Sequence, residues 1–97
     1  MRTLSLLPRA EVDVIEAALW YEGERLGLGQ AFEDEFHRLA TRIQESPEQF
    51  PEVEPDVRRG LLGRFPYGVF FVVEEAAVVV IAVLHLHRDP ETLRGRR

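Results

Sequence analysis

Apolar residues follow two different periods along this chain, and the first is helical. Between Arg9 and Gly27, Val12, Ile15 and Leu19 recur at i, i+3 and i+7 among acidic side chains. This spacing predicts an amphipathic helix with its apolar side turned to the core. The helix is expected to end near Gly27, because glycine accepts the left-handed conformation of a helix C-cap.

A second helix follows the Gly-Leu-Gly turn. Its apolar positions lie at i, i+4, i+7 and i+11 and comprise Phe32, Phe36, Leu39 and Ile43. Ser46 precedes Pro47 and marks its end, since a residue before proline avoids helical geometry. The short connection predicts that the two helices form an antiparallel hairpin.

The rest of the pattern is β. We expect a short N-terminal strand at Thr3–Leu7 and further strands at Val57–Arg64, Tyr67–Glu74 and Ala77–His87, which are rich in β-branched and aromatic residues. About two residues separate the last two, which forces an antiparallel hairpin. The order predicts an α+β fold in a single domain, residues 1–97, of a length typical for one domain.

Two strands are apolar at every position, Val69–Val73 and Val78–Leu84. A sheet with one wet face alternates apolar and polar residues, so both faces of this sheet require cover. Two interpretations follow. Either the central strand is strongly twisted and its neighbours close the second face, or that face is a groove filled by another chain.

The distribution of charge along the chain says more about possible function than the overall composition does. The 97 residues include no cysteine, which excludes disulfides and a thiol nucleophile, and no lysine. The net charge is −5, but residues 1–55 carry 5 Arg against 12 acidic residues and residues 56–97 carry 7 Arg against 5. The longest uncharged apolar run has nine residues, against the ~20 that a membrane span needs, and no signal peptide is apparent. We therefore expect a cytoplasmic protein.

The basic half contains the candidate chemistry. Arg58, Arg59, Arg64 and Arg88 are candidates for phosphate contacts if they converge, and the alternative is that they pair with the acidic helices. His85 and His87 point the same way on a strand, as an acid/base pair or as structural histidines. Two histidines do not make a zinc site, so we expect no metal and no cofactor.

Several motifs, in their order and spacing, make the chain similar to a known superfamily. They are Trp20-Tyr21-Glu22, Leu26-Gly27-Leu28-Gly29, Val57-Arg58-Arg59, Arg64-Phe65-Pro66-Tyr67 and His85-x-His87-Arg88-Asp89-Pro90. With them, the chain resembles the RelE/ParE superfamily, the toxins of bacterial type II toxin–antitoxin systems, also called plasmid stabilisation proteins. The resemblance implies a helical hairpin on a curved, mainly antiparallel sheet, and an antitoxin that wraps and neutralises the toxin.

The superfamily contains two activities. RelE-like members cleave mRNA in the ribosome without metal, and here their site implies an Arg/His set of Arg58, Arg59, Arg64, His85 and Arg88. ParE-like members bind DNA gyrase. The absence of lysine, and Gly68 at a position where the nucleases tend to have arginine, favour the ParE-like group.

We therefore expect a toxin that a cognate antitoxin neutralises in a hetero-oligomer and that acts on a protein target such as DNA gyrase. The alternatives are a ribosome-dependent mRNA endoribonuclease and an inactive toxin-fold binding protein. The expected partner-binding residues are Phe70, Val72, Val78, Val80, Arg64 and Arg88.

Overall fold

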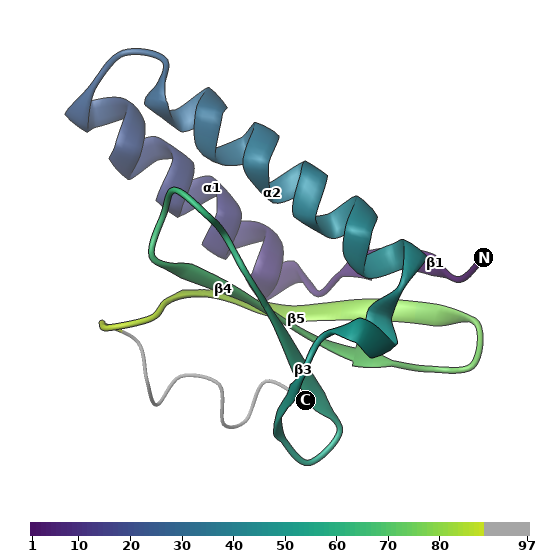
Figure 1. Ribbon diagram of the computed structural model, residues 1–97. Coiled ribbons are helices and arrows are strands. Elements are labelled where there is room, and N and C mark those ends of the chain that lie inside the picture. Colours follow the sequence, from purple (N-terminus) through teal and green to yellow (C-terminus); the bar gives the residue numbers. More distant parts are fainter. Residues whose placement is uncertain (89–97) are drawn as a thin grey trace.

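Two helices lie side by side against one face of a five-stranded sheet in the computed structural model, which describes residues 1–88 (Figure 1). In chain order the elements are β1 (Thr3–Leu6), α1 (Pro8–Glu24), α2 (Leu28–Glu45), the 3₁₀ turn η1 (Pro47–Gln49), β2 (Glu52–Glu54), β3 (Val57–Leu61), β4 (Tyr67–Val73) and β5 (Ala77–His85). This confirms the α+β fold with an N-terminal strand and a helical hairpin. Asp89 and Pro90, the end of the last sequence motif, lie outside the described residues.

The strand order is β1-β5-β4-β3-β2, with β1 parallel to β5 and the other pairs antiparallel. Two local predictions are wrong. The strand predicted to reach Arg64 ends at Leu61, because the residues up to Pro66 form the β3–β4 loop. The short strand β2 was not expected, since its three residues are all exposed and two are glutamates, which leaves no apolar alternation to detect.

A β-bulge explains why β5 is apolar at consecutive positions. Phe70 of β4 pairs with Ala82 and Phe71 pairs with Val80, so Ile81 is an extra residue in β5. Side chains that face the helices have even numbers before the bulge and odd numbers after it, as Val80 and Val83 show. The apolar run therefore serves both faces of the sheet.

The second face of the sheet is closed. A cluster of buried residues lies on it: Val57, Phe70, Ile81, Ala82 and Leu84. The partly buried side chains of Leu7, Val72 and Val79 pack against this cluster. The apolar side chains on this face are thus buried within the folded chain, and its use as a groove for another chain stays a prediction.

The face of α1 that enters the core is also not the predicted one. Val12, Ile15 and Leu19 are 46%, 54% and 67% exposed. The buried side of α1 consists of Ala10, Val14, Ala17, Ala18 and Tyr21, which have their own helical spacing. Four of these five are alanine or valine, so the helix backbone lies close to the sheet and to α2. The larger apolar side chains are left on the opposite side.

One side-chain hydrogen bond orients α1. β1 pairs with β5 only as far as Val80, while β5 continues to His85. The N–H of Val83 lies beyond the end of β1 and donates to Oδ2 of Asp13 at 2.9 Å. Asp13 belongs to α1, so this contact holds the helix along the open part of the β5 edge, with its alanine side turned inward.

The turn between the helices depends on two glycines and one carboxylate. Gly27 has φ +87°, in the left-handed region. The carboxylate of Glu22 accepts hydrogen bonds from the N–H groups of Gly27 at 2.9 Å and Gly29 at 3.0 Å. These backbone donors lower the pKa of Glu22. The motifs around Glu22 and Gly27 are thus explained by the geometry of the hairpin.

Gly29 is required by the contact between the helices. A Cβ at this position would lie 2.5 Å from the backbone oxygen of Ala18, whereas a Cβ at Gly23 would meet nothing within 4 Å. We expect Gly29→Ala to lower the free energy of unfolding by about 1–3 kcal/mol, since the backbone has to move. Gly23→Ala, the control, is expected to be neutral or to stabilise α1 by up to about 1 kcal/mol. Urea denaturation measures both, and equal stability of the two variants would contradict this account.

Glu22 predicts a pH dependence of stability. Because folding lowers its pKa, its ionised form contributes stability above the ordinary value of 4.5, and this contribution is lost as the pH falls through the lower pKa of the folded state. Glu22→Gln is therefore expected to be less stable than the parent near neutral pH, with a difference that shrinks in acid. Thermal unfolding between neutral pH and pH 3 tests this, with Glu24→Gln as the control. A difference that does not change with pH would refute it.

Candidate functional site

Aromatic rings from four elements and a loop meet at one end of the sheet. The ring centroids of Tyr21 and Phe65 are 4.7 Å apart, those of Phe32 and Tyr67 5.1 Å, and those of Tyr67 and His85 5.3 Å. We call these five residues the aromatic cluster. It joins α1, α2, the β3–β4 loop, β4 and β5, so several motifs that are distant in sequence form one packed unit.

Two of the candidate arginines lie at the rim of the aromatic cluster. The guanidinium carbon of Arg64 is 5.5 Å from the ring centroid of Phe65, and that of Arg88 is 5.4 Å from the ring of Trp20. Burial raises the pKa of the Tyr21 hydroxyl, and the positive charge of Arg88 opposes this effect. Tyr21 therefore stays protonated at neutral pH and contributes packing to the cluster.

The two histidines lie close together at the end of β5. Their ring centroids are 5.8 Å apart, and Nδ1 of His85 accepts a hydrogen bond from the backbone N–H of His87 at 3.1 Å. This bond requires an unprotonated Nδ1, so neutral His85 carries its proton on Nε2. Within residues 1–88 no group of three or more His, Asp or Glu side chains is arranged to hold a metal ion.

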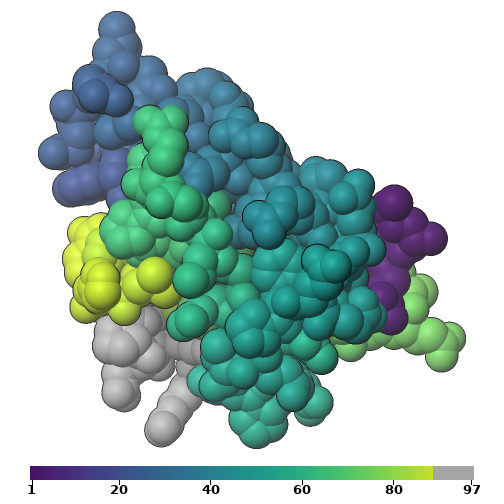
Figure 2. Space-filling view, viewed as in Figure 1, coloured from purple at the N-terminus to yellow at the C-terminus, as the bar shows by residue number. Residues whose placement is uncertain are grey.

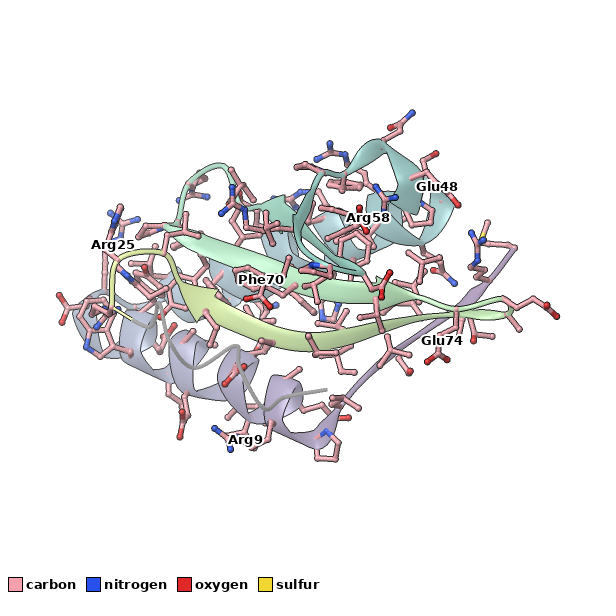
Figure 3. All side chains as sticks on the ribbon, turned by 90° about the horizontal axis from the view of Figure 1, so that it is seen from below. Arg9, Arg25, Glu48, Arg58, Phe70 and Glu74 are labelled. Atoms are coloured by element: carbon pink, nitrogen blue, oxygen red, sulfur yellow. The ribbon has the colours of Figure 1, made fainter. Side chains whose placement is uncertain are left out.

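Arg58 and Arg59 lie apart from the aromatic cluster and from each other. Arg58 donates to the backbone oxygen of Phe50 at 2.6 Å, and Figure 3 shows it beside Glu48 at the η1 segment. Arg59 lies on the opposite face, where its Cδ would be 3.2 Å from a Cβ placed on Gly68. Its Nε is buried and has no hydrogen-bond partner among residues 1–88. This divergence follows from strand alternation, because successive residues of a strand point to opposite faces of the sheet.

The five candidate catalytic residues are therefore only partly brought together. His85 belongs to the aromatic cluster and Arg64 and Arg88 lie at its rim, while Arg58 and Arg59 do not join them. A basic set that converges on a single phosphate is not formed by these residues.

The expected partner-binding residues divide between the two faces of the sheet. Phe70 is 8% exposed and lies on the face turned away from the helices, as Figure 3 shows, with the half-buried Val72 on the same face. Val78 and Val80 are fully buried beneath the helices. The prediction that Val78 and Val80 lie on a binding surface is wrong. The register between β4 and β5 turns both of these side chains toward the core beneath the helices.

The β3–β4 loop is held against α2 by one carboxylate. Oε2 of Glu35 accepts hydrogen bonds from the N–H groups of Gly63 and Arg64, the latter at 3.0 Å. In Figure 2 this loop lies against the helical hairpin. A groove of about 450 Å³ runs beside it, lined in part by Arg38, Arg42 and Arg64. Glu35 was not among the candidate residues, because its position on α2 is polar and no sequence motif surrounds it.

A second groove, of about 410 Å³, lies near the turn between the helices. It is lined by Ile15 and Leu19 of α1, by Leu26 of the turn and by Gln30 and Glu33 of α2. The exposed apolar side of α1 therefore continues into a hollow between the helices. Ile15 and Leu19 were predicted to face the core, and instead they line this groove.

The fold and these surfaces define a small α+β protein with apolar and basic regions on its surface. Among residues 1–88, no helix combines the length and the apolar character that a membrane span requires. The family model for the ParE toxin of type II toxin–antitoxin system, parDE, matches residues 4–90, so the chain belongs to the ParE toxin family.

A solved structure shows the same fold. The chain is similar to one described as the chromosomal ParDE TA system from P. aeruginosa, with a TM-score of 0.75 and 20% sequence identity over 90% of this chain and 98% of that chain. No curated protein gives a significant sequence match.

The Glu35 contact predicts how the loop responds to mutation. We expect Glu35→Ala to speed hydrogen exchange at the amides of Gly63 and Arg64 about tenfold or more, because a hydrogen bond to a charged acceptor contributes about 1.5–3 kcal/mol. Asp34→Ala, on the exposed side of α2, is the control. Unchanged exchange at both amides in Glu35→Ala would show that the carboxylate does not hold the loop.

Proposed function

We propose that this ParE-family protein is a toxin that a cognate antitoxin neutralises and that acts by binding a protein target such as DNA gyrase. A cytoplasmic location and a toxin–antitoxin hetero-oligomer are part of the proposal, because both partners act inside the cell. Family membership supports the toxin role.

The observation that carries the choice of a protein target is the dispersal of the basic residues. Cleavage of RNA by a ribose 2′-hydroxyl requires a base, an acid and cations at one phosphate. Here Arg58 is bonded to a backbone carbonyl near η1, and Arg59 lies on the far face of the sheet. The surface instead has apolar contact regions, above all Val12, Ile15 and Leu19, which suit contact with a protein.

The second candidate, mRNA cleavage, has one observation in its favour. His85 belongs to the aromatic cluster and Arg64 and Arg88 lie at its rim, so a histidine and two cations are associated with the same cluster. The inactive binding protein remains the third candidate, and absence of growth arrest on expression would identify it.

The proposal is tested with purified DNA gyrase. We expect the full chain to inhibit supercoiling, and we expect the product of a short reading frame adjacent to its gene, added as the antitoxin, to restore it. His85→Ala is expected to inhibit gyrase as the parent does, because imidazole chemistry has no part in protein binding. Circular dichroism checks that this variant is folded.

Two outcomes would contradict the proposal. Supercoiling that is unaffected by saturating protein would remove gyrase as the target. Cleaved transcripts in a translating extract, lost in His85→Ala and Arg64→Ala, would establish the endoribonuclease instead.

A further inference from the structure

Three arginines line the groove between α2 and the β3–β4 loop. Its volume is about 450 Å³, with α2 forming one wall and the end of β3 and the loop forming the other. Arg38 and Arg42 lie about one helical turn apart on α2, and Arg64 belongs to the loop. All three side chains are exposed. We call this hollow the arginine groove.

The three guanidinium groups form no ion pair with a carboxylate of residues 1–88. Asp34 lies four residues before Arg38, but its Oδ1 accepts a hydrogen bond from Gln30 at 2.9 Å. Glu45 lies three residues after Arg42. Neither of these acidic residues lines the groove. The N–H groups of the arginines are therefore available to a ligand.

Among residues 1–88, the carboxylate that lines the arginine groove is that of Glu35. Its Oε2 is used by the N–H groups of Gly63 and Arg64, and its Oε1 is buried. The carbonyl end of α2, where Arg42 lies, adds a partial negative charge of about half an elementary charge. Three full positive charges exceed both contributions, so the groove attracts anions.

Aromatic rings position two of the guanidinium groups. The guanidinium carbon of Arg42 is 5.6 Å from the ring centroid of Phe50, and that of Arg64 is 5.5 Å from the ring centroid of Phe65. Such a contact occupies one face of the planar guanidinium and leaves the N–H groups at its edge free to bind an oxyanion. The rings thereby reduce the freedom that these side chains lose when a ligand binds.

A terminal phosphate suits this arrangement better than a carboxylate does. It carries up to two negative charges and three acceptor oxygens, whereas a carboxylate has one charge and two oxygens. The larger number of acceptors allows guanidinium groups from both walls to bind the same group. Leu61, which is 50% exposed, lines the groove beside the arginines, so the organic part of a ligand has an apolar side chain to contact.

We propose that the arginine groove binds the terminal phosphate of a small organic phosphate of the nucleotide class. Arg38, Arg42 and Arg64 hold the phosphate, and Leu61 contacts the base. The volume lies in the range of small-molecule sites, about 300–1,000 Å³. The site is independent of gyrase inhibition, because binding is measured on the isolated chain.

The test is isothermal titration calorimetry of the full chain with ADP. We expect binding that weakens as salt is added, because the contacts are between charges. Arg38→Gln combined with Arg42→Gln is expected to weaken binding about tenfold or more. Arg9→Gln combined with Arg25→Gln removes the same charge from exposed positions outside the groove. This matched control is expected to bind ADP as the parent does.

Further ligands and variants separate the parts of the site. Adenosine, which lacks the phosphate, is expected not to bind. Leu61→Ser is expected to weaken binding of ADP about threefold and to leave binding of inorganic phosphate unchanged. Arg38→Lys combined with Arg42→Lys is expected to bind with intermediate affinity, because lysine keeps the charge without the planar fork. Thermal unfolding confirms that each variant is folded.

Four results would overturn the proposal. They are absence of binding at millimolar ADP, an equal loss of affinity in the control pair, adenosine binding as tightly as ADP, and tighter binding of a macromolecular anion than of ADP. The last is measured with a DNA strand of about ten nucleotides and with a glutamate-rich peptide, each on the parent and on the Arg38→Gln, Arg42→Gln variant. It would assign the groove to docking of a nucleic acid or of a protein.

Discussion

The hydrogen bond from the Val83 N–H to the Asp13 carboxylate determines how the two layers of this protein meet. β5 is longer than β1, so part of its edge has no strand beside it, and an unpaired N–H there would be costly in a half-buried position. Asp13 supplies the acceptor and thereby sets the rotation of α1 about its axis. With that rotation set, Ala10, Val14 and Ala17 face inward and the larger apolar residues of α1 face outward.

The functional surfaces follow from this arrangement. Since α1 packs through small residues, Tyr21 reaches the aromatic cluster, and Arg88 comes to lie over Trp20 at its rim. The same packing leaves Val12, Ile15 and Leu19 exposed on the outside of the molecule. This fold offers an apolar helix face bordered by acidic residues and a separate groove bordered by arginines.

Much of the fold could be predicted from periodicity, and much less of the site. The α2 stripe of Phe32, Phe36 and Leu39 is buried as expected, because one helix face is strongly apolar and the other strongly polar. α1 has two apolar faces, one of small residues and one of large residues, and hydrophobicity alone favours the wrong one. Similarly, the opposite directions of Arg58 and Arg59 follow from strand alternation, whereas their separation from Arg64 depends on where the strand ends and the loop begins.

By itself, the sequence determined the order of helices and strands, the tight glycine turn between the helices and the concentration of arginine in the β half. These are local properties, controlled by side-chain periodicity, backbone freedom and composition. Only the tertiary structure decided which face of α1 is buried, which side of β5 each valine occupies and which basic residues meet. The physical reason is that each of these depends on a contact between distant segments: Asp13 with Val83, the bulge at Ile81 against β4, and Glu35 with the β3–β4 loop.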